Sequence, residues 1–382
     1  MEYSLPYILL LLFFLGIAAI QLGLPIEEKS RRYINFLVVI VYVLFFGFRG
    51  FIGWDWTNYY SFFKNLNTSN LNGFELGFVY YTYLIKSIFH TYQSFILINT
   101  ITNIILLTIF FKRYLSEKYY ALGIVIFITF SGFVLETDLM RNAKSILLFM
   151  ISLKYIENKS FLKFLALNIL GVLFHWSSLV LLPLYFFIQK PISLKLFLIV
   201  IVFGNIIFLF NIPYIKPIIL FVSNFLGETI RAKISYYFTN ELYSKAYALS
   251  IGYFFRQFIT IFVLFYYDRI IKCSKSGAIF INSFFIFIVF YLYFAEVSIA
   301  VQRLTIMFSY SFFILIPILF DLIIPVSTRY ILMLILTTYM LIKISVLSNN
   351  ILYRYDNSLF GEVQSYKDRM STFDSNYKHL ER

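Results

Sequence analysis

The chain has 382 residues, of which 60% are hydrophobic and only 13% are charged, and its net charge is +13. This composition excludes an ordinary soluble domain, and repeated apolar runs of about 20 residues indicate a polytopic α-helical membrane protein. The apolar runs are continuous rather than alternating, which excludes a transmembrane β-barrel. The positive charge does not indicate nucleic acid binding, because basic loops on one side of a membrane explain it better.

Twelve apolar segments follow one another along the chain, and we predict an all-α fold with about 11–13 transmembrane helices. The first segment is long enough to span and lacks a basic flank before it, which argues against a cleavable signal peptide. The predicted spans are residues 4–24, 34–52, 93–111, 119–135, 142–157, 161–175, 176–189, 194–211, 250–267, 278–296, 303–325 and 329–348.

Short loops rich in Lys and Arg mark the cytoplasmic side of a membrane protein. They contain Lys29, Arg31, Arg32, Lys112, Arg113, Lys118, Lys154, Lys159, Lys163, Lys190, Lys195, Arg269, Lys272 and Lys275. All of these loops fall on the cytoplasmic side if both termini lie outside. The segments 53–75 and 212–250 are then external loops. The segment 75–90 must then be re-entrant or one arm of a bent helix. We expect a single transmembrane domain over 1–348, with short amphipathic pieces in 212–250, followed by a polar, partly ordered tail over 349–382.

Four arginines lie near the external ends of predicted spans, against the positive-inside tendency. They are Arg49, Arg141, Arg256 and Arg303. A charge near the hydrocarbon costs roughly 2.5–3.5 kcal/mol on insertion scales, so such residues usually have a function. A guanidinium matches phosphate oxygens and stays charged when partly buried, so these arginines are candidate ligands for a phosphate group. The alternative is snorkelling, or pairing with Asp55, Glu75, Asp138 or Glu296.

His175 opens the run His175-Trp176-Ser177-Ser178 between two short apolar segments. A histidine titrates near neutral pH and is suited to take a proton from a sugar hydroxyl. The alternative is an interfacial histidine that caps a helix. The acidic candidates are Asp55, Glu75 and Asp138. Each carboxylate is suited to act as base, to orient His175, to bind sugar hydroxyls or to neutralise an arginine.

Aromatic residues accompany these polar groups. Trp54, Tyr59, Tyr60 and Trp176 are candidates for stacking on sugar rings, although Trp and Tyr are also enriched at any membrane interface. The sequence has no Walker loop, no HExxH motif and no external DxD pair, so we expect neither a nucleotide cofactor nor a metal. The lone Cys273 has no partner for a disulfide.

In order and spacing, these motifs resemble the Wzy-type bacterial polysaccharide polymerases, in particular the EpsG-like branch. The matching pieces run from about residue 30 to 330: Arg49 with Gly53-Trp54-Asp55, Tyr59 and Phe63; Glu75-Leu76-Gly77-Phe78; Arg141-Asn142-Ala143; His175-Trp176-Ser177-Ser178-Leu179 with Pro183-Leu184-Tyr185; and Arg303 before a span ending near Pro317. Two positions depart from the pattern. Trp54 replaces a small or hydroxyl residue, and Asn142 replaces a common Gln.

The resemblance implies a membrane glycosyltransferase of GT-C-like architecture on the external face of the bacterial inner membrane. Such proteins join repeat units carried on undecaprenyl diphosphate into an O-antigen, capsule or exopolysaccharide. It implies donor and acceptor glycolipids as partners, with a chain-length regulator and a flippase nearby, and no cofactor. The arginines would hold the diphosphate, and His175 or a carboxylate would activate the acceptor hydroxyl.

Three other functions compete with this interpretation. An O-antigen ligase uses the same donor with a different acceptor, so only the motif order favours a polymerase. A flippase or transporter needs polar groups through the bilayer depth, whereas the ionisable residues here gather at one end of the spans. A membrane acyltransferase would need a second polar cluster on the cytoplasmic side, which the sequence lacks.

Overall fold

The computed structural model describes residues 2–66, 73–225, 227–239, 246–323, 325–361 and 363–377. Within these ranges the chain is helical, and its β-structure is limited to one isolated bridge between Arg49 and Asn357. The predicted all-α fold is confirmed. Parts of the predicted loops 53–75 and 212–250 and of the tail lie outside the described residues.

Several helices are suited to cross a membrane by length and composition. Five are long and apolar enough: α1 (Leu5–Gly23), α2 (Glu28–Gly47), α5 (Tyr92–Tyr114), the composite helix Glu117–Thr137 and α20 (Val326–Ser348). A sixth candidate is the pair α18 (Ser298–Ile306) and α19 (Tyr310–Leu322), which is bent by 63°. Shorter apolar helices lie at Phe161–Phe174, Trp176–Phe187, Leu194–Leu209, Ile251–Phe265 and Gly277–Tyr293. The chain is therefore a multi-pass membrane protein, and the count of about 11–13 spans stays a prediction.

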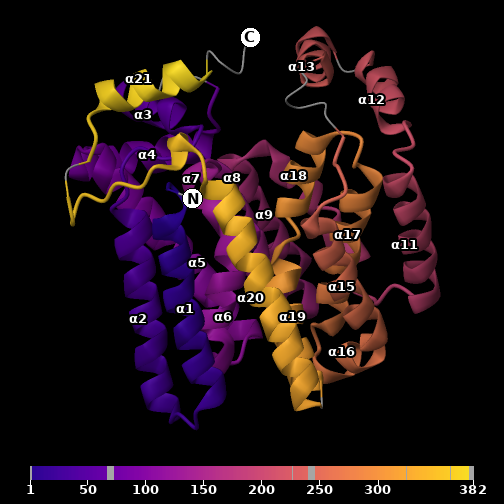
Figure 1. Cartoon of the computed structure of the whole chain (residues 1–382). Coiled ribbons are helices and arrows are strands. Elements are labelled where there is room, and N and C mark those ends of the chain that lie inside the picture. The colour runs from indigo at the N-terminus through magenta and orange to yellow at the C-terminus, as the bar shows by residue number, and fades with distance from the viewer. Residues whose placement is uncertain are drawn as a thin grey trace. The chain divides into compact units, whose positions relative to one another are not determined.

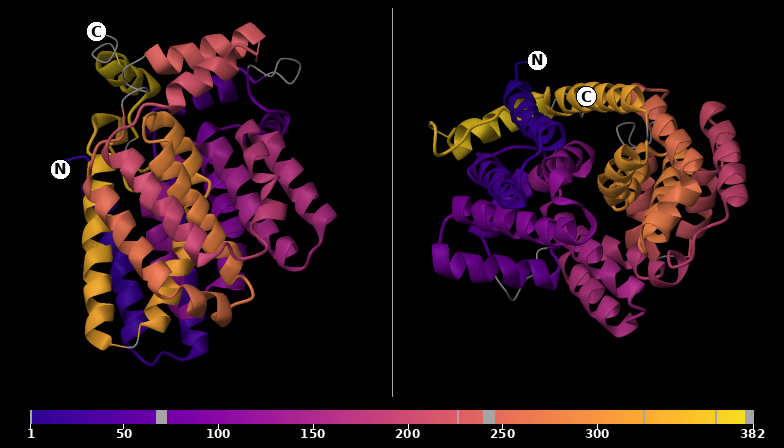
Figure 2. Two further views of the ribbon diagram at one scale, coloured as in Figure 1. Left: turned by 90° about the vertical axis from the view of Figure 1, so that its right-hand side faces the viewer. Right: turned by 90° about the horizontal axis from the view of Figure 1, so that it is seen from below.

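The helices group into two compact units, Met1–Phe186 with Tyr330–Arg382, and Phe187–Arg329. In the first unit α1 and α2 form a hairpin, α2 packs on α5, and α1 packs on α6 (Tyr120–Phe127) (Figure 1). The same hairpin is seen from two other directions in Figure 2. The largest helix contact joins α8 (Met140–Glu157) to α9 (Phe161–Phe174).

The composite helix Glu117–Thr137 changes from α-helical to π-helical winding before it reaches Glu136. It begins with η1 (Glu117–Tyr119) and α6, continues as a π-helical turn, η2 (Ile128–Gly132), and ends as α7 (Phe133–Thr137). A π-turn holds one extra residue, so it rotates every following side chain about the helix axis, and such turns are frequent at functional sites. The rotation precedes Glu136 and Asp138, which are buried.

Two short helices of the first unit lie in the segment between α2 and α5. α3 (Trp56–Lys64) buries Trp56, Tyr59, Phe62 and Phe63 on one face. α4 (Leu76–Phe89) packs on α5 and α9 and ends at His90, whose φ of 59° turns the chain directly into α5. The predicted bent arm is therefore a separate helix of 14 residues, shorter than the roughly 20 that cross a bilayer.

The second unit contains the remaining apolar helices. They are α11 (Leu194–Leu209), α12 (Ile215–Ser223), α13 (Gly227–Thr239), α15 (Ile251–Phe265), α16 (Tyr267–Cys273), α17 (Gly277–Tyr293), α18 and α19. α17 packs on α11, α18 and α19, while α12 packs on α13. The Glu296 carboxylate accepts hydrogen bonds from the backbone N–H groups of Tyr214 and Ile215 at the start of α12. This carboxylate therefore satisfies orphan donors at a helix N-terminus, where negative charge is favourable.

The tail after α20 packs on the first unit. It contains η4 (Ile351–Tyr353) and α21 (Tyr366–Tyr377), and α21 lies beside α3 (Figure 1). Tyr366 stacks on Tyr60 of α3 with ring centroids 4.7 Å apart. The buried Arg369 donates to the backbone carbonyl of Phe51. The described tail is therefore part of the folded unit.

Three predicted spans differ from the structure for local reasons. The span 34–52 ends at Gly47, since the following residues pair with the tail. The span 176–189 divides into a 3₁₀ helix, η3 (Trp176–Leu181), and α10 (Leu184–Phe187), with Pro183, which has no N–H to donate, between them. The span 303–325 begins inside α18 and crosses the bend into α19.

Gly77 sets the distance between α4 and α9, and this gives a stability prediction. A Cβ at Gly77 would lie 2.8 Å from the Leu173 carbonyl oxygen, so Gly77→Ala must separate the two helices. We expect a loss of about 1–3 kcal/mol of stability, as for other overpacked contacts, measured as a lower thermal unfolding midpoint in detergent. Gly16→Ala in α1 is the control, because nothing lies within 4 Å of its Cβ position. Equal midpoints for the two variants would contradict the prediction.

Candidate active site

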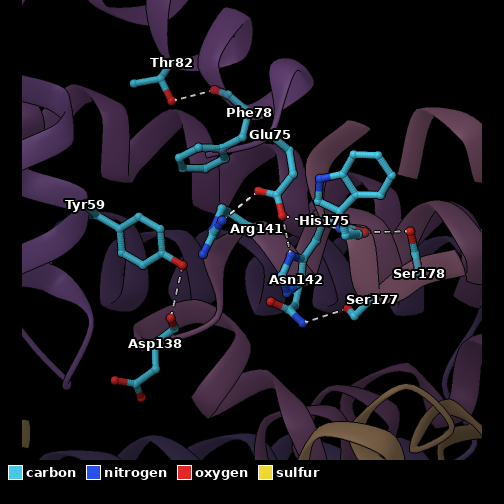
Figure 3. A network of polar contacts seen from close by, with 11 residues as sticks. Tyr59, Glu75, Phe78, Thr82, Asp138, Arg141, Asn142, His175, Ser177 and Ser178 are labelled. Atoms are coloured by element: carbon cyan, nitrogen blue, oxygen red, sulfur yellow. Dashed lines mark hydrogen bonds and ion pairs between the residues drawn. The ribbon is translucent and has the colours of Figure 1, made fainter. Parts of the chain in front are cut away.

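Glu75 joins two other predicted residues in one ionic cluster. Its Oε2 accepts a hydrogen bond from Arg141 Nη1 at 2.6 Å, and its Oε1 lies 2.7 Å from His175 Nδ1 (Figure 3). The three residues come from the start of α4, the start of α8 and the end of α9. The structure thus brings together a cation, a carboxylate and an imidazole that lie up to 100 residues apart in the sequence.

His175 sits where α9 gives way to η3. Its backbone is extended, with φ −161° and ψ 125°, and its N–H bonds back to Gly171 as the helix ends. Its carbonyl accepts from the Ser178 hydroxyl at 2.8 Å, while the Trp176 N–H donates to Glu75 Oε1 at 3.3 Å. The backbone of His175 therefore lies at the junction of α9 and η3, and its side chain is held by Glu75 and 22% exposed.

Arg141 connects this cluster to a pocket. Its guanidinium lies over the Phe74 ring at 4.7 Å from the centroid, and its side chain is 25% exposed. The pocket has a volume of about 400 Å³ and is lined by Asn58, Ser61, Phe62, Asn65, Gly73, Phe74 and Arg141. Arg141 therefore reaches Glu75 and a space large enough for a ligand.

The carboxyl group of Glu75 is held in its charged form. Burial would raise its pKa, but the hydrogen bond from His175 and the charge of Arg141 outweigh burial and lower the pKa to about 2. Glu75 therefore accepts hydrogen bonds at neutral pH and is unsuited to donate a proton. A carboxylate that accepts from Nδ1–H fixes the histidine tautomer and leaves Nε2 as an acceptor.

Asp138 organises a second cluster around the segment that follows α2. Its Oδ1 accepts from the Trp54 N–H at 2.5 Å, and its Oδ2 accepts from the Tyr353 hydroxyl of the tail at 3.0 Å. Gly53 lies against Asp138 with φ 96°, where a Cβ would both overlap Oδ1 and be strained. Burial raises the pKa of Asp138, and these hydrogen bonds oppose the rise. Asp138 is 6% exposed, and its carboxylate holds the backbone of Trp54 in place.

Arg49 is buried in a separate polar network around Glu136. Its guanidinium donates to the carbonyl oxygens of Phe46 and Glu136 and to the Thr100 hydroxyl. The Glu136 carboxylate accepts from Tyr42, Thr100 and Asn103, and Lys144 donates to Asn99 and Asn103. Arg49 is 3% exposed, so this network, rather than a ligand, surrounds its charge.

The predicted aromatic residues have different environments. Tyr59 is buried and donates to the Asp138 carbonyl at 3.2 Å. Tyr60 is half-buried against Tyr366 of the tail, and Trp54 is half-buried beside Asp138. Trp176 alone among them is largely exposed, at 64%. Asp55 precedes α3, where its carbonyl accepts from the Asn58 and Tyr59 N–H groups.

The other two predicted arginines belong to the second unit. Arg256 lies in α15 with its guanidinium 4.2 Å from the Tyr291 ring centroid. Arg303 lies in α18 with an exposed side chain. The predicted pairing of an arginine with Glu296 is not seen in the part of the chain that the structure describes, because Glu296 bonds to the start of α12.

Sequence reasoning missed four buried polar residues that support these clusters. Glu136 and Lys144 lie within apolar helices, and such isolated charges were a signal that the sequence offered. Tyr353 and Arg369 lie in the polar tail, where composition gives no indication of burial.

The Glu75 cluster generates a pH prediction for Glu75→Gln. A carboxyl group with a lowered pKa stabilises the folded state above its unfolded pKa, near 4.5, and loses this effect as the pH falls toward 2. We expect the variant to lose about 3 kcal/mol at neutral pH, because Arg141 loses its counter-charge. The difference in thermal midpoint should persist at pH 5 and shrink below about pH 4.5. A difference that vanishes between pH 7 and 5 would contradict the ion pair.

Comparison with known proteins gives one match. The model of the EpsG family matches residues 32–357, which include most of α2, the two clusters around Glu75 and Asp138, and the start of the tail. Neither the curated proteins nor the solved structures contain a match, so the GT-C-like arrangement stays a prediction. The match covers most of the chain and confirms the resemblance drawn from the motifs. The protein therefore belongs to the EpsG family and is a membrane protein of polysaccharide polymerisation.

Proposed function

We propose that this EpsG-family protein joins oligosaccharide repeat units carried on undecaprenyl diphosphate, at the external face of the bacterial inner membrane. The observation that carries the proposal is the cluster of Arg141, Glu75 and His175 beside a pocket. Transfer of a glycan from a lipid diphosphate needs a cation for the leaving group and a base for the attacking hydroxyl. The cluster combines both groups.

In the proposed reaction, an acceptor sugar hydroxyl attacks C1 of the donor glycan. The new glycosidic bond forms as the bond between C1 and the diphosphate oxygen breaks, with inversion at C1. The proton of the hydroxyl passes to His175 Nε2, because Nδ1 is held by Glu75 at 2.7 Å. The departing diphosphate carries negative charge, which Arg141 stabilises.

The proposed diphosphate site contains fewer arginines than the four that the sequence indicated. Arg49 is left out, since its guanidinium is enclosed by Phe46, Glu136 and Thr100. Arg256 and Arg303 belong to the second unit, and their roles at the diphosphate stay predictions from the sequence. Asp138 is proposed to position backbone near Arg141 rather than to act as a base.

Polymer synthesis in the host tests these roles. Arg141→Ala and His175→Ala should abolish long polymer, because the first removes leaving-group stabilisation and the second removes the base. Removing a positioned base costs typically 10²–10⁴-fold in rate, which is enough to eliminate polymer on a gel. Protein levels in the membrane should stay near wild type. Lys190→Ala is the control, since this exposed residue lies away from both clusters in sequence and was predicted on the cytoplasmic side.

Deletion of the gene separates this function from its rivals. A surface glycan with a single repeat unit in the deletion strain supports the polymerase. Lipid-linked polymer that never reaches its acceptor would identify a ligase, and repeats trapped on the cytoplasmic leaflet would identify a flippase. Normal polymer from both Arg141→Ala and His175→Ala would refute the roles given to the cluster.

A further inference from the structure

One face of α3 is polar and lines the pocket beside Arg141. Asn58, Ser61 and Asn65 are spaced three and four residues apart, so their side chains share one face of the helix. All three are exposed, whereas Tyr59 and Phe62 of the same helix are buried. The pocket therefore has a polar wall.

The remaining wall of the pocket is aromatic and cationic. Phe74 stacks on Phe62 with ring centroids 4.1 Å apart, and the Arg141 guanidinium lies over Phe74. These contacts hold the Phe74 ring in place. The pocket thus joins hydrogen-bonding groups to a rigid apolar surface, the combination found in ligand sites.

We propose that this pocket is a subsite for one sugar residue of the lipid-linked glycan, a proposal that rests on the proposed function. A sugar hydroxyl both donates and accepts hydrogen bonds, and Asn and Ser side chains do the same. The C–H face of a sugar ring is apolar and fits against the half-buried Phe74. The volume of about 400 Å³ falls within the range of small-ligand pockets.

The position of the subsite links it to the chemistry. Arg141 belongs to the pocket and to the Glu75 cluster, so a sugar in the pocket lies next to the proposed diphosphate site. The exposed polar wall leaves the neighbouring sugars of a chain in water. We therefore place sugar recognition on the polar face of α3. The sequence had predicted it on the aromatic face, where Tyr59 is buried.

A double variant, Asn58→Ala with Asn65→Ala, tests the subsite in full-length protein reconstituted in nanodiscs. Lys64→Gln is the matched control, since Lys64 is exposed on the same helix and does not line the pocket. With lipid-linked repeat units as substrate, we expect the double variant to raise KM about tenfold while kcat at saturation stays near wild type. Both variants should keep the wild-type unfolding midpoint.

Two ligands distinguish whether the bound sugar belongs to the donor or to the acceptor. The repeat-unit oligosaccharide released from its lipid has no diphosphate and can serve only as acceptor, whereas the intact glycolipid can also serve as donor. Weaker binding of the free oligosaccharide to the double variant supports an acceptor subsite. Weaker binding of the glycolipid alone supports a donor subsite.

Direct binding measurements keep this test separate from that of the proposed function, because they need no turnover. Equal affinities of wild type and double variant for both ligands would overturn the subsite, even if polymer forms. Wild-type protein that binds through Asn58 and Asn65 but makes no polymer would refute the proposed function and leave the subsite standing.

Discussion

The carboxylate of Glu75 is the interaction on which the site depends. A buried carboxylate is strongly unfavourable unless it is paired and hydrogen-bonded, so Arg141 and His175 must stay beside it. Their positions in turn fix the starts of α4 and α8 and the end of α9. Gly77 lets α4 approach the Leu173 carbonyl closely enough for this pairing, because any Cβ would separate the helices. Packing and electrostatics therefore select the same arrangement.

A second buried network supports the segment that carries Arg141. Glu136 accepts three side-chain hydrogen bonds through its carboxylate, and its carbonyl accepts from Arg49. Asp138, two residues later, is tied to Trp54 and to Tyr353 of the tail. These contacts fix the link between α7 and α8, and Arg141 follows within the first turn of α8. The tail and the segment after α2 thus help to fix the position of Arg141.

The sequence was sufficient for the helical membrane fold, the family and the residues that meet at Glu75. Long apolar runs specify spans directly, since bilayer thickness sets their length. It was insufficient for the roles of individual arginines, because Arg49 and Arg141 have similar sequence settings, yet Arg49 is buried and the Arg141 side chain is 25% exposed. It also missed the docking of the tail. Hydrogen bonds between Gly50 and Asp356 or Gly53 and Leu352 join segments about 300 residues apart, and no local pattern encodes such pairing.

The contrast between the two faces of α3 shows how the same short segment serves stability and recognition. Its aromatic residues take part in packing: Tyr60 stacks on Tyr366, and Trp56 contacts Phe373 of α21. The tail therefore covers this aromatic side of the helix, and a sugar ring would have to displace it to stack there. The polar side, with Asn58 and Ser61, stays open toward Arg141. The aromatic residues of α3 in this chain are thus weaker evidence for sugar contact than the exposed amides beside the paired Arg141.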